Sequence, residues 1–409
     1  MNNDWTDEVV ICEPVRTAVG VDGGMYRDLT AADLATQALT GLMSRTGLGE
    51  GEVDDVIFGY CYPTSEAPAI GRVAALNAGL GIETGGLQLD RRCGSSLQAV
   101  LYAAMSVGSG FADVVVAGGV EAMSQAEFYA LGLKQGVRGD SLEMVNRISR
   151  GRTTAGGMHF PVPGGMLETA ENLRAEYSIS RTEQDEFALH SQAKAVEATQ
   201  EGRFRDEVVP VTVPGTRRTP EQVIVTDEHP RQGLTMEDLA RLRPIRSGVD
   251  PRATVTPGNA CGQSDGAAAC VVTTRAKAEE LGLRPMVRVV AGAVAGVAPR
   301  TMGIGPVPAV AKVLERAQLT LDDMDLIEIN EAFAAQVIAC LREWKVDPND
   351  PRLNPNGSGI SLGHPAGATG ARILATLSHE LHRRQARYGL ETMCIGGGQG
   401  LAAVFERAD

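Results

Sequence analysis

The sequence lacks the marks of a secreted, a zinc-binding or a membrane-spanning protein. Its seven cysteines are scattered and odd in number, and none are spaced as CxxC, which argues against a disulfide framework and a zinc knuckle. No apolar run reaches the roughly 18 residues that a membrane span needs. The opening MNNDWTDEVV carries no basic and apolar signal pattern. These absences predict a cytoplasmic protein with no metal site and no membrane partner.

Positive charge is also scarce in this chain. Lys and Arg number 38 against 51 Asp and Glu, so the formal net charge is -13. An acidic chain of this kind binds phosphate backbones poorly, which argues against a nucleic-acid partner. An anionic ligand therefore has to meet a local cluster of basic residues.

The 409 residues suffice for about two or three domains. Strand-like and helix-like segments alternate, which predicts an α/β protein with a mainly parallel sheet. We expect an N-terminal half over 1–124 that is completed by 251–280, and a C-terminal half over 281–409. Residues 125–250, with a helix expected from about Glu183 and Thr182 as its N-cap, are interpreted as a loop domain over the site. A mobile surface insertion is the alternative interpretation.

Two segments far apart in the chain share one pattern. LTGLMSRTGLGEGEVDDVIFG (39–59) and VAKVLERAQLTLDDMDLIEIN (310–330) each suggest an amphipathic helix, an acidic turn and a strand. The spacing that aligns Leu42 with Val313 also aligns Cys93 with His364. We infer that the two halves are copies of one unit, so that Cys93 and His364 occupy related strand-to-helix turns.

The stretch LDRRCGSSLQAV (89–100) puts Cys93 before a segment that is apolar almost all round, which predicts a buried helix. The positive end of a helix favours a thiolate by about 0.3–1 kcal/mol, or ~2 kcal/mol when partly buried. That lowers a thiol pKa of about 8.5 by roughly one unit, so a histidine partner would be needed for full activation. A buried, inert thiol is the simpler interpretation of Cys93 taken alone.

Three further stretches carry residues suited to chemistry, although each also has a plain structural interpretation. In NPNGSGISLGHPAGATGAR (354–372), His364 lies in a glycine-rich turn before an expected helix, and Pro365 is suited to be the first residue of that helix. A His364 that only caps the turn is as well supported as a catalytic His364. In TMCIGGGQG (392–400), Cys394 ends a strand before glycine N–H groups that suit an oxyanion, or is a core cysteine. In EINEAFAAQV (328–337), Asn330 ends a strand, where helix capping is the simpler role.

Taken together, these stretches resemble the thiolase family over nearly the whole chain. The matching motifs, in the order of the family, are RRCGSSLQA, AGGVEAMS, MLETAEN, TVTPGNACGQSDGAAA, MGIGPVPA, NEAFA, GHPAGATGAR and CIGGGQG. The resemblance implies an α/β fold in which two similar halves form a five-layer αβαβα sandwich, with an inserted loop domain that covers coenzyme A. It also implies a homodimer or a homotetramer.

The resemblance assigns chemical roles to five residues. Cys93 is implied as the acylated nucleophile, His364 as the base that activates it, and Cys394 as the acid/base for the acetyl methyl carbon. Asn330, through a water, and His364 would line one oxyanion site. The backbone N–H groups of Cys93 and Gly396 would line the other. The implied reaction is thiolysis of a 3-oxoacyl-CoA or the reverse Claisen condensation.

Coenzyme A is implied as a substrate and not as a permanently bound cofactor, so the expected partners are acyl-CoA and coenzyme A. Arg231 in DEHPR matches a residue that contacts coenzyme A in the family. Cys261 falls where a pantetheine-contacting serine is common, and the residues expected beside the thioester and pantetheine are Met166, Met302 and Phe333. No metal is required; a zinc site of Cys93, Cys394 and His364 is an alternative that would quench both thiolates.

The chain departs from the usual family residue at several positions: Asp90, Ser96, Gly165, Cys261, Ser264 and Ser358. Short-chain acetoacetyl-CoA thiolases have a histidine where this chain has Gly165, so the acyl-chain preference stays open. A decarboxylating condensing enzyme of the same superfamily is an alternative, although such enzymes use a Cys-His-His or Cys-His-Asn set and Cys394 argues against it. An acyl-CoA-binding protein with little activity is the other alternative.

Overall fold

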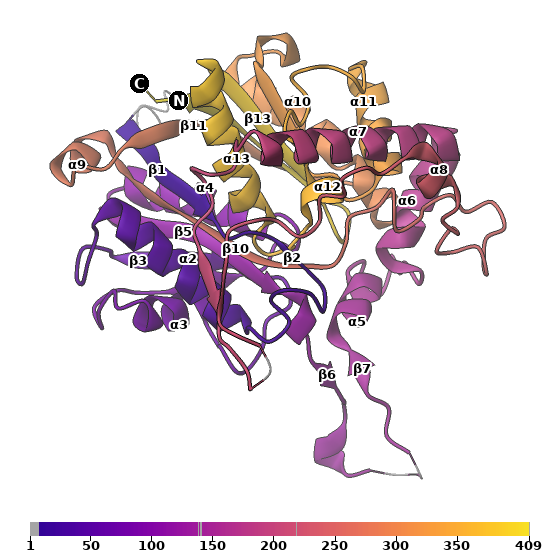
Figure 1. Cartoon of the computed structure of the whole chain (residues 1–409), viewed down its shortest axis with the longest axis horizontal. Helices are drawn as coiled ribbons and strands as arrows, with labels where there is room; N and C mark the ends of the chain where they lie inside the picture. The colour runs from indigo at the N-terminus through magenta and orange to yellow at the C-terminus, as the bar shows by residue number, and fades with distance from the viewer. Residues whose placement is uncertain (1–7, 138, 140, 218, 409) are drawn as a thin grey trace.

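The computed structural model describes residues 8–137, 139, 141–217 and 219–408, and a ten-stranded sheet runs through them (Figure 1). The strand order is β12-β13-β14-β11-β1-β10-β5-β3-β4, and β2 pairs with β10. The bounds are β1 Val9–Arg16, β2 Gly20–Val21, β3 Asp55–Gly59, β4 Leu87–Leu89, β5 Val114–Ala122, β10 Ser264–Thr274, β11 Pro285–Gly296, β12 Leu326–Ile329, β13 Tyr388–Ile395 and β14 Gln399–Arg407. Two small hairpins pair β6 Phe128–Tyr129 with β7 Val145–Asn146, and β8 Val211–Val213 with β9 Gln222–Ile224.

The α-helices complete the chain. Their bounds are α2 Ala31–Thr46, α3 Ile70–Asn77, α4 Ser95–Gly108, α5 Arg147–Thr154, α6 Gly165–Glu176, α7 Arg181–Gln200, α8 Met236–Ala240, α9 Arg275–Glu280, α10 Pro306–Ala317, α11 Ala334–Trp344, α12 Gly359–Leu362 and α13 Thr369–Arg384. Short 3-10 helices are η1 Met123–Gln125, η2 Leu133–Gln135, η3 Pro299–Ile304 and η4 Leu321–Asp323. In the described part of the chain, no helix combines the length and the apolar character that a membrane crossing needs.

The two halves of the sheet repeat one strand order. Read outward from the centre, β1-β10-β5-β3 and β11-β14-β13-β12 show the same succession of antiparallel, antiparallel and parallel pairs. The internal repeat inferred from the sequence is therefore confirmed. The mainly parallel sheet expected from alternating segments is wrong, because β10 and β14 run antiparallel to both of their neighbours. The three residues between β13 and β14 can connect only antiparallel strands.

Helices cover the sheet in the five layers expected. In the N-terminal half, α2 and α3 form an outer layer, and their apolar residues share one core with β1, β3, β5 and β10. In the C-terminal half, α10 and α11 form the other outer layer against β11–β14. Between the half-sheets lie α4 and α13, which contact each other and share a third core with strands of both halves. The αβαβα sandwich is confirmed.

The two inner helices approach one another closely at their N-terminal ends. The Ala371 N–H of α13 donates to the Ser96 hydroxyl of α4 at 3.0 Å. A Cβ added at Gly370 would lie 2.5 Å from the backbone nitrogen of Leu97, so only glycine fits there. This contact brings the turns that precede α4 and α13, which carry Cys93 and His364, to one place.

The segment between the two parts of the N-terminal half carries α5 to α8 and the small hairpins. Figure 1 shows β6 and β7 in an arm that extends away from the body, while α7 lies across the body and contacts α11 and α12. The helix expected from Glu183 begins instead at Arg181. Ser180 is the N-cap, because its hydroxyl accepts the Glu183 N–H while the Glu183 carboxylate accepts the Ser180 N–H.

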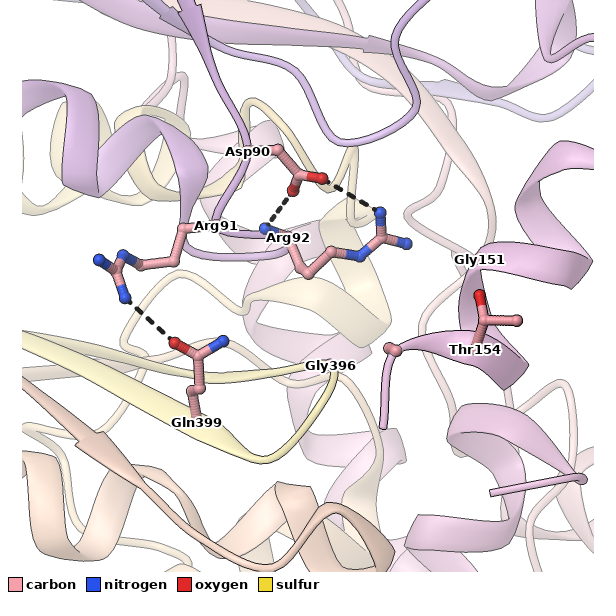
Figure 2. Close-up of a pocket in the computed structure, with 8 residues that line it drawn as sticks. Asp90, Arg91, Arg92, Gly151, Thr154, Gly396 and Gln399 are labelled. Atoms are coloured by element: carbon pink, nitrogen blue, oxygen red, sulfur yellow. Dashed lines mark hydrogen bonds and ion pairs between the residues drawn. The ribbon is translucent and has the colours of Figure 1, made fainter. Parts of the chain in front are cut away.

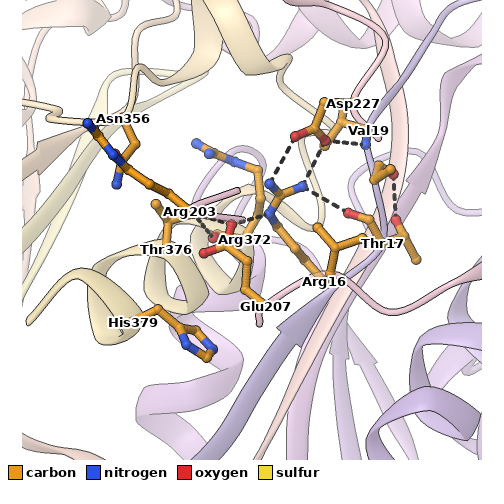
Figure 3. A network of polar contacts seen from close by, with 12 residues as sticks. Arg16, Thr17, Val19, Arg203, Glu207, Asp227, Asn356, Arg372, Thr376 and His379 are labelled. Atoms are coloured by element: carbon orange, nitrogen blue, oxygen red, sulfur yellow. Dashed lines mark hydrogen bonds and ion pairs between the residues drawn. The ribbon is translucent and has the colours of Figure 1, made fainter. Parts of the chain in front are cut away.

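A buried ion cluster ties this segment to both halves (Figure 3). Arg16 of β1 is fully buried and pairs with Glu207 at 2.6 Å and with Asp227 at 2.7 Å. Glu207 also accepts a hydrogen bond from the Thr376 hydroxyl of α13 at 3.0 Å. Because a buried cation needs its counter-ions, the cluster holds residues of three parts of the chain in one arrangement.

Candidate active site

Cys93 stands on a strained turn between β4 and α4. Arg92 has a φ of 48°, in the left-handed region that non-glycine residues seldom adopt. Two hydrogen bonds hold the turn: the Arg92 N–H donates to Asp90 Oδ1 at 2.6 Å, and the Arg91 N–H donates to the Ser95 hydroxyl at 2.9 Å. The turn places Cys93 just before α4. This helix is largely buried, as the sequence predicted.

Two hydrogen bonds hold His364, one to its backbone and one to its ring. Its backbone N–H donates to the Ser264 hydroxyl at 2.9 Å, and its Nδ1 lies 2.6 Å from the Thr369 hydroxyl. Because that hydroxyl donates to the Pro365 carbonyl at 2.9 Å, it accepts the proton of Nδ1. This tautomer leaves the lone pair on Nε2. Pro365 itself lies in the turn and does not open a helix, since α13 begins only at Thr369.

Burial sets the protonation state of this imidazole. It lowers the pKa of His364 to about 3, and the positive charges of Arg372 and Arg152 act in the same direction. The ring is therefore neutral at neutral pH. A neutral ring can accept a proton through Nε2, but it brings no positive charge that would stabilise a neighbouring thiolate.

Two opposing effects act on the pKa of the Cys93 thiol. Burial raises its pKa above the ordinary value. The Arg92 guanidinium, the Gly396 N–H and the Arg152 guanidinium lower it, in that order of size, but burial prevails. The free protein thus carries a protonated thiol, and the helix start does not ionise it. Activation requires a group that removes the proton, and Nε2 of His364 is suited to that task.

Cys394 and Gly396 lie at the end of β13. Cys394 is fully buried, which raises its pKa well above the ordinary value, and the neighbouring Cys93 and Cys340 sulfurs add to the effect. The turn that follows has φ of 91° and 89° at Gly397 and Gly398. The Gly398 N–H donates to the Ile395 carbonyl at 3.2 Å, so it is not free for an oxyanion. The Gly396 N–H instead lies close enough to lower the Cys93 pKa.

Asn330 does not cap a helix. It directly follows β12, which ends at Ile329, whereas α11 begins at Ala334 with Phe333 as N-cap and no side-chain cap. The Asn330 carboxamide nitrogen lies 3.4 Å from Nδ1 of His364. Its oxygen is buried and has no hydrogen-bond partner among the described residues. The carboxamide is therefore a polar group beside His364 with capacity to spare.

The residues named from the sequence meet at one cavity of about 520 Å3, called here the central cavity. Such a volume is typical of small-molecule sites. All of them but Asn330, which lies beside His364, belong to the lining: Cys93, His364, Cys394, Gly396, Arg231, Cys261, Met166, Met302 and Phe333. An outer cavity of about 280 Å3 adjoins it on the side of Arg231. No group of three or more His, Cys, Asp or Glu in the described chain is arranged for a metal ion.

Most of the residues that depart from the usual thiolase residue make a specific hydrogen bond in the structure. Asp90 holds the Arg92 N–H, Ser96 joins the two inner helices, and Ser264 holds His364. The Ser358 hydroxyl accepts from Arg372 at 3.3 Å. The Cys261 N–H donates to the Ala332 carbonyl at 3.0 Å, while burial raises the pKa of its thiol to about 12.

Two residues of the site were missed in the sequence. Thr369 fixes the His364 tautomer, and its only signal is a hydroxyl inside the apolar GHPAGATGAR turn. Arg152 lines the central cavity, and nothing in its local pattern distinguishes it from the neighbouring Arg147 and Arg150.

Comparison with known proteins places this geometry in a family. The chain matches the thiolase N-terminal domain over residues 9–276 and the thiolase C-terminal domain over residues 283–407. A beta-ketothiolase of Cupriavidus necator is 45% identical over 404 residues, which cover 98% of this chain and 100% of that protein. A beta-ketoadipyl-CoA thiolase of Pseudomonas aeruginosa is 42% identical and covers 98% of this chain and 99% of its own length.

A solved structure agrees with these relatives. The crystal structure of the Bacillus anthracis acetyl-CoA acetyltransferase superposes with a TM-score of 0.93 at 42% identity, covering 98% of this chain and 99% of that chain. Both family domains occur here in order, and sequence and fold agree over nearly the full length. The chain therefore belongs to the thiolase family and is an acyltransferase.

Proposed function

We propose that this chain cleaves 3-oxoacyl-CoA with coenzyme A into acyl-CoA and acetyl-CoA, or runs the reverse Claisen condensation, through an acyl group on Cys93. The observation that carries the proposal is the meeting of Cys93, a neutral His364, Cys394 and the Gly396 N–H at one cavity. A nucleophile, a base, a proton donor and an oxyanion donor are the groups that this reaction needs.

In the first half-reaction the Cys93 sulfur attacks the 3-oxo carbon while Nε2 of His364 takes the thiol proton. The bond between C2 and C3 then breaks, the acyl group stays on Cys93, and the acetyl-CoA carbanion takes a proton from Cys394. The N–H groups of Cys93 and Gly396 would stabilise the oxyanion on the acyl carbon. Asn330 and His364 would serve the enolate oxygen of acetyl-CoA.

In the second half-reaction a coenzyme A thiol attacks the thioester on Cys93. Its proton passes to the Cys394 thiolate, the acyl group leaves as acyl-CoA, and the Cys93 sulfur recovers its proton from His364. Each group thus returns to its starting state, and no metal takes part. The high pKa of Cys394 suits it to hand its proton to a carbanion.

Coenzyme A would enter from the side of Arg231, which lines both the central and the outer cavity. Met166, Met302, Phe333 and Cys261 would then flank pantetheine and the thioester. We propose that residues 125–250 form the cover over coenzyme A, that 1–124 with 251–280 and 281–409 form the two halves, and that the protein acts in the cytoplasm. All seven cysteines are unpaired, which fits a reducing compartment.

We propose a homo-oligomer because β4 is an end strand of the sheet and several large apolar side chains are exposed. Met105 of α4 is 50% exposed, and Phe111 is 86% exposed. The arm adds exposed Leu131 and Leu142. Sedimentation equilibrium should give a dimer or a tetramer, and Met105→Glu should weaken the dimer. A monomer at all concentrations would contradict this.

A thiolysis assay with coenzyme A and a panel of 3-oxoacyl-CoA esters tests the function. Cleavage that depends on coenzyme A is expected. Acyl chains longer than that of acetoacetyl-CoA, or branched chains, should be accepted, because Gly165 leaves room where short-chain acetoacetyl-CoA thiolases have a histidine. Strict preference for acetoacetyl-CoA would refute the second expectation. No cleavage of any member would favour the acyl-CoA-binding alternative, and decarboxylation of a malonyl thioester would favour a condensing enzyme.

His364→Ala should slow alkylation of Cys93 by iodoacetamide near neutral pH. The neutral ring takes the thiol proton as the sulfur reacts, so without it alkylation should be about 10²-fold slower over the neutral part of its pH profile, the lower end of the effect of a lost general base. Mass spectrometry of the Cys93 peptide provides the measurement, with the exposed His190→Ala as control. An unchanged profile would mean that Arg92 and Arg152 alone activate the thiol.

A further inference from the structure

A second cavity continues from the central cavity beside Cys93. Its volume is about 450 Å3, and we call it the arginine-lined cavity (Figure 2). The two cavities share Arg92, Gly151, Ala155 and Gly396, whereas the outer cavity joins the central one at Arg231. The central cavity therefore has two extensions. With coenzyme A entering past Arg231, the arginine-lined cavity remains for the far end of an acyl group on Cys93.

Positive charge is in excess where these two cavities meet. Asp90 receives both the backbone N–H and the guanidinium of Arg92, so that cation is compensated (Figure 2). Among the described residues, the Arg91 guanidinium donates only to the neutral carboxamide of Gln399, at 3.1 Å, and its Nε is buried without a partner. In a chain with a net charge of -13, this local excess of cations is unusual.

Arg152 of α5 is, besides Arg92, a second cation whose charge acts on the Cys93 thiol. It lines the central cavity, is half-buried, and has no carboxylate partner in the described part of the chain. Its charge acts on the pKa of four groups of that cavity, namely Tyr62, Cys93, Cys261 and His364. Its Cβ would lie 3.4 Å from a Cβ at Gly165, so it borders the space that Gly165 leaves open.

A guanidinium in such a place gains most from a carboxylate, which can accept two parallel N–H bonds. We propose that the acyl group taken by this enzyme ends in a carboxylate, so that the substrate is the 3-oxoacyl-CoA half-thioester of a dicarboxylic acid, with Arg152 as its counter-ion. This inference rests on the proposed thiolysis and adds the substrate class. Arg152 is here a specificity-determining residue.

The test compares two esters of equal length: a six-carbon 3-oxoacyl-CoA with a terminal carboxylate and its neutral six-carbon counterpart. The readout is the ratio of their kcat/KM values for thiolysis. Because Arg152 also influences the Cys93 thiol, its loss affects both esters through the thiolate, and the ratio cancels that effect. Arg152→Gln should lower the ratio roughly 10- to 100-fold, the scale of a lost charge-assisted hydrogen bond. Arg152→Lys should retain part of the preference.

Arg150→Gln is the matched control, because Arg150 lies on the same helix and is exposed. Its ratio should stay within about twofold of the wild-type ratio. The proposal is overturned if Arg152→Gln leaves the ratio unchanged, or if it raises the KM for coenzyme A equally with both esters, which would assign the guanidinium to a coenzyme A phosphate. Cleavage of the neutral ester alone also overturns it, whereas cleavage of neither ester refutes the thiolysis itself.

Discussion

Cys93→Ala should lower the rate of thiolysis by about 10⁴-fold or more, the scale of a lost nucleophile in an acyl-transfer enzyme. The reason is that no other thiol of the central cavity can take its place. Burial raises the pKa of the Cys261 thiol to about 12, and it raises the pKa values of the Cys61 and Cys394 thiols well above the ordinary value. None of the three stands at the start of a helix beside Arg92 and the Gly396 N–H.

Incubation of the wild-type protein with an acyl-CoA donor should add the acyl mass to the peptide that contains Cys93. Cys261→Ser provides the matched control, since it removes a second thiol from the same cavity and should leave acylation at Cys93 detectable. Acyl mass found only at Cys261 or Cys394 would disprove the assignment of the nucleophile, even if the enzyme were active.

Cys394→Ala should separate the two kinds of chemistry at this site. Acyl transfer to Cys93 needs the nucleophile, His364 and one oxyanion site, so the variant should still become acylated. Forming or breaking the C–C bond also needs a group that moves a proton at the acetyl methyl carbon. The variant should therefore lose thiolysis, and the exchange of acetyl-CoA α-protons in deuterium oxide, by about 10²-fold or more.

A buried cysteine that served only the core would behave differently. Cys340 is such a residue: its thiol is fully buried in α11, donates to the Gly303 carbonyl at 3.3 Å, and does not belong to the lining of the central cavity. Cys340→Ala should reduce stability modestly and leave α-proton exchange in place. If Cys394→Ala exchanges these protons at nearly the wild-type rate, another group moves the proton and the condensing-enzyme alternative regains support.

Several features of this protein could be predicted from the sequence because they depend on local pattern. The segment after Cys93 is apolar almost all round, a pattern typical of a buried helix, and α4 is largely buried. The repeated helix, turn and strand of 39–59 and 310–330 predicted two similar halves, and the strand orders agree. The motifs that resemble the thiolase family also led to residues that line one cavity.

Other features were decided only by tertiary structure, because they depend on groups that the chain brings together from a distance. The direction of each strand depends on the path of the whole chain. The alternation of strand-like and helix-like segments therefore could not predict that β10 and β14 are antiparallel to their neighbours. The protonation of Cys93 and His364 follows from how deeply each is buried and from the charge of Arg152, which periodicity does not report. Thr369 lies five residues after His364, and the fold of their turn places its hydroxyl against Nδ1 of the ring. This hydrogen bond determines which ring nitrogen carries the proton.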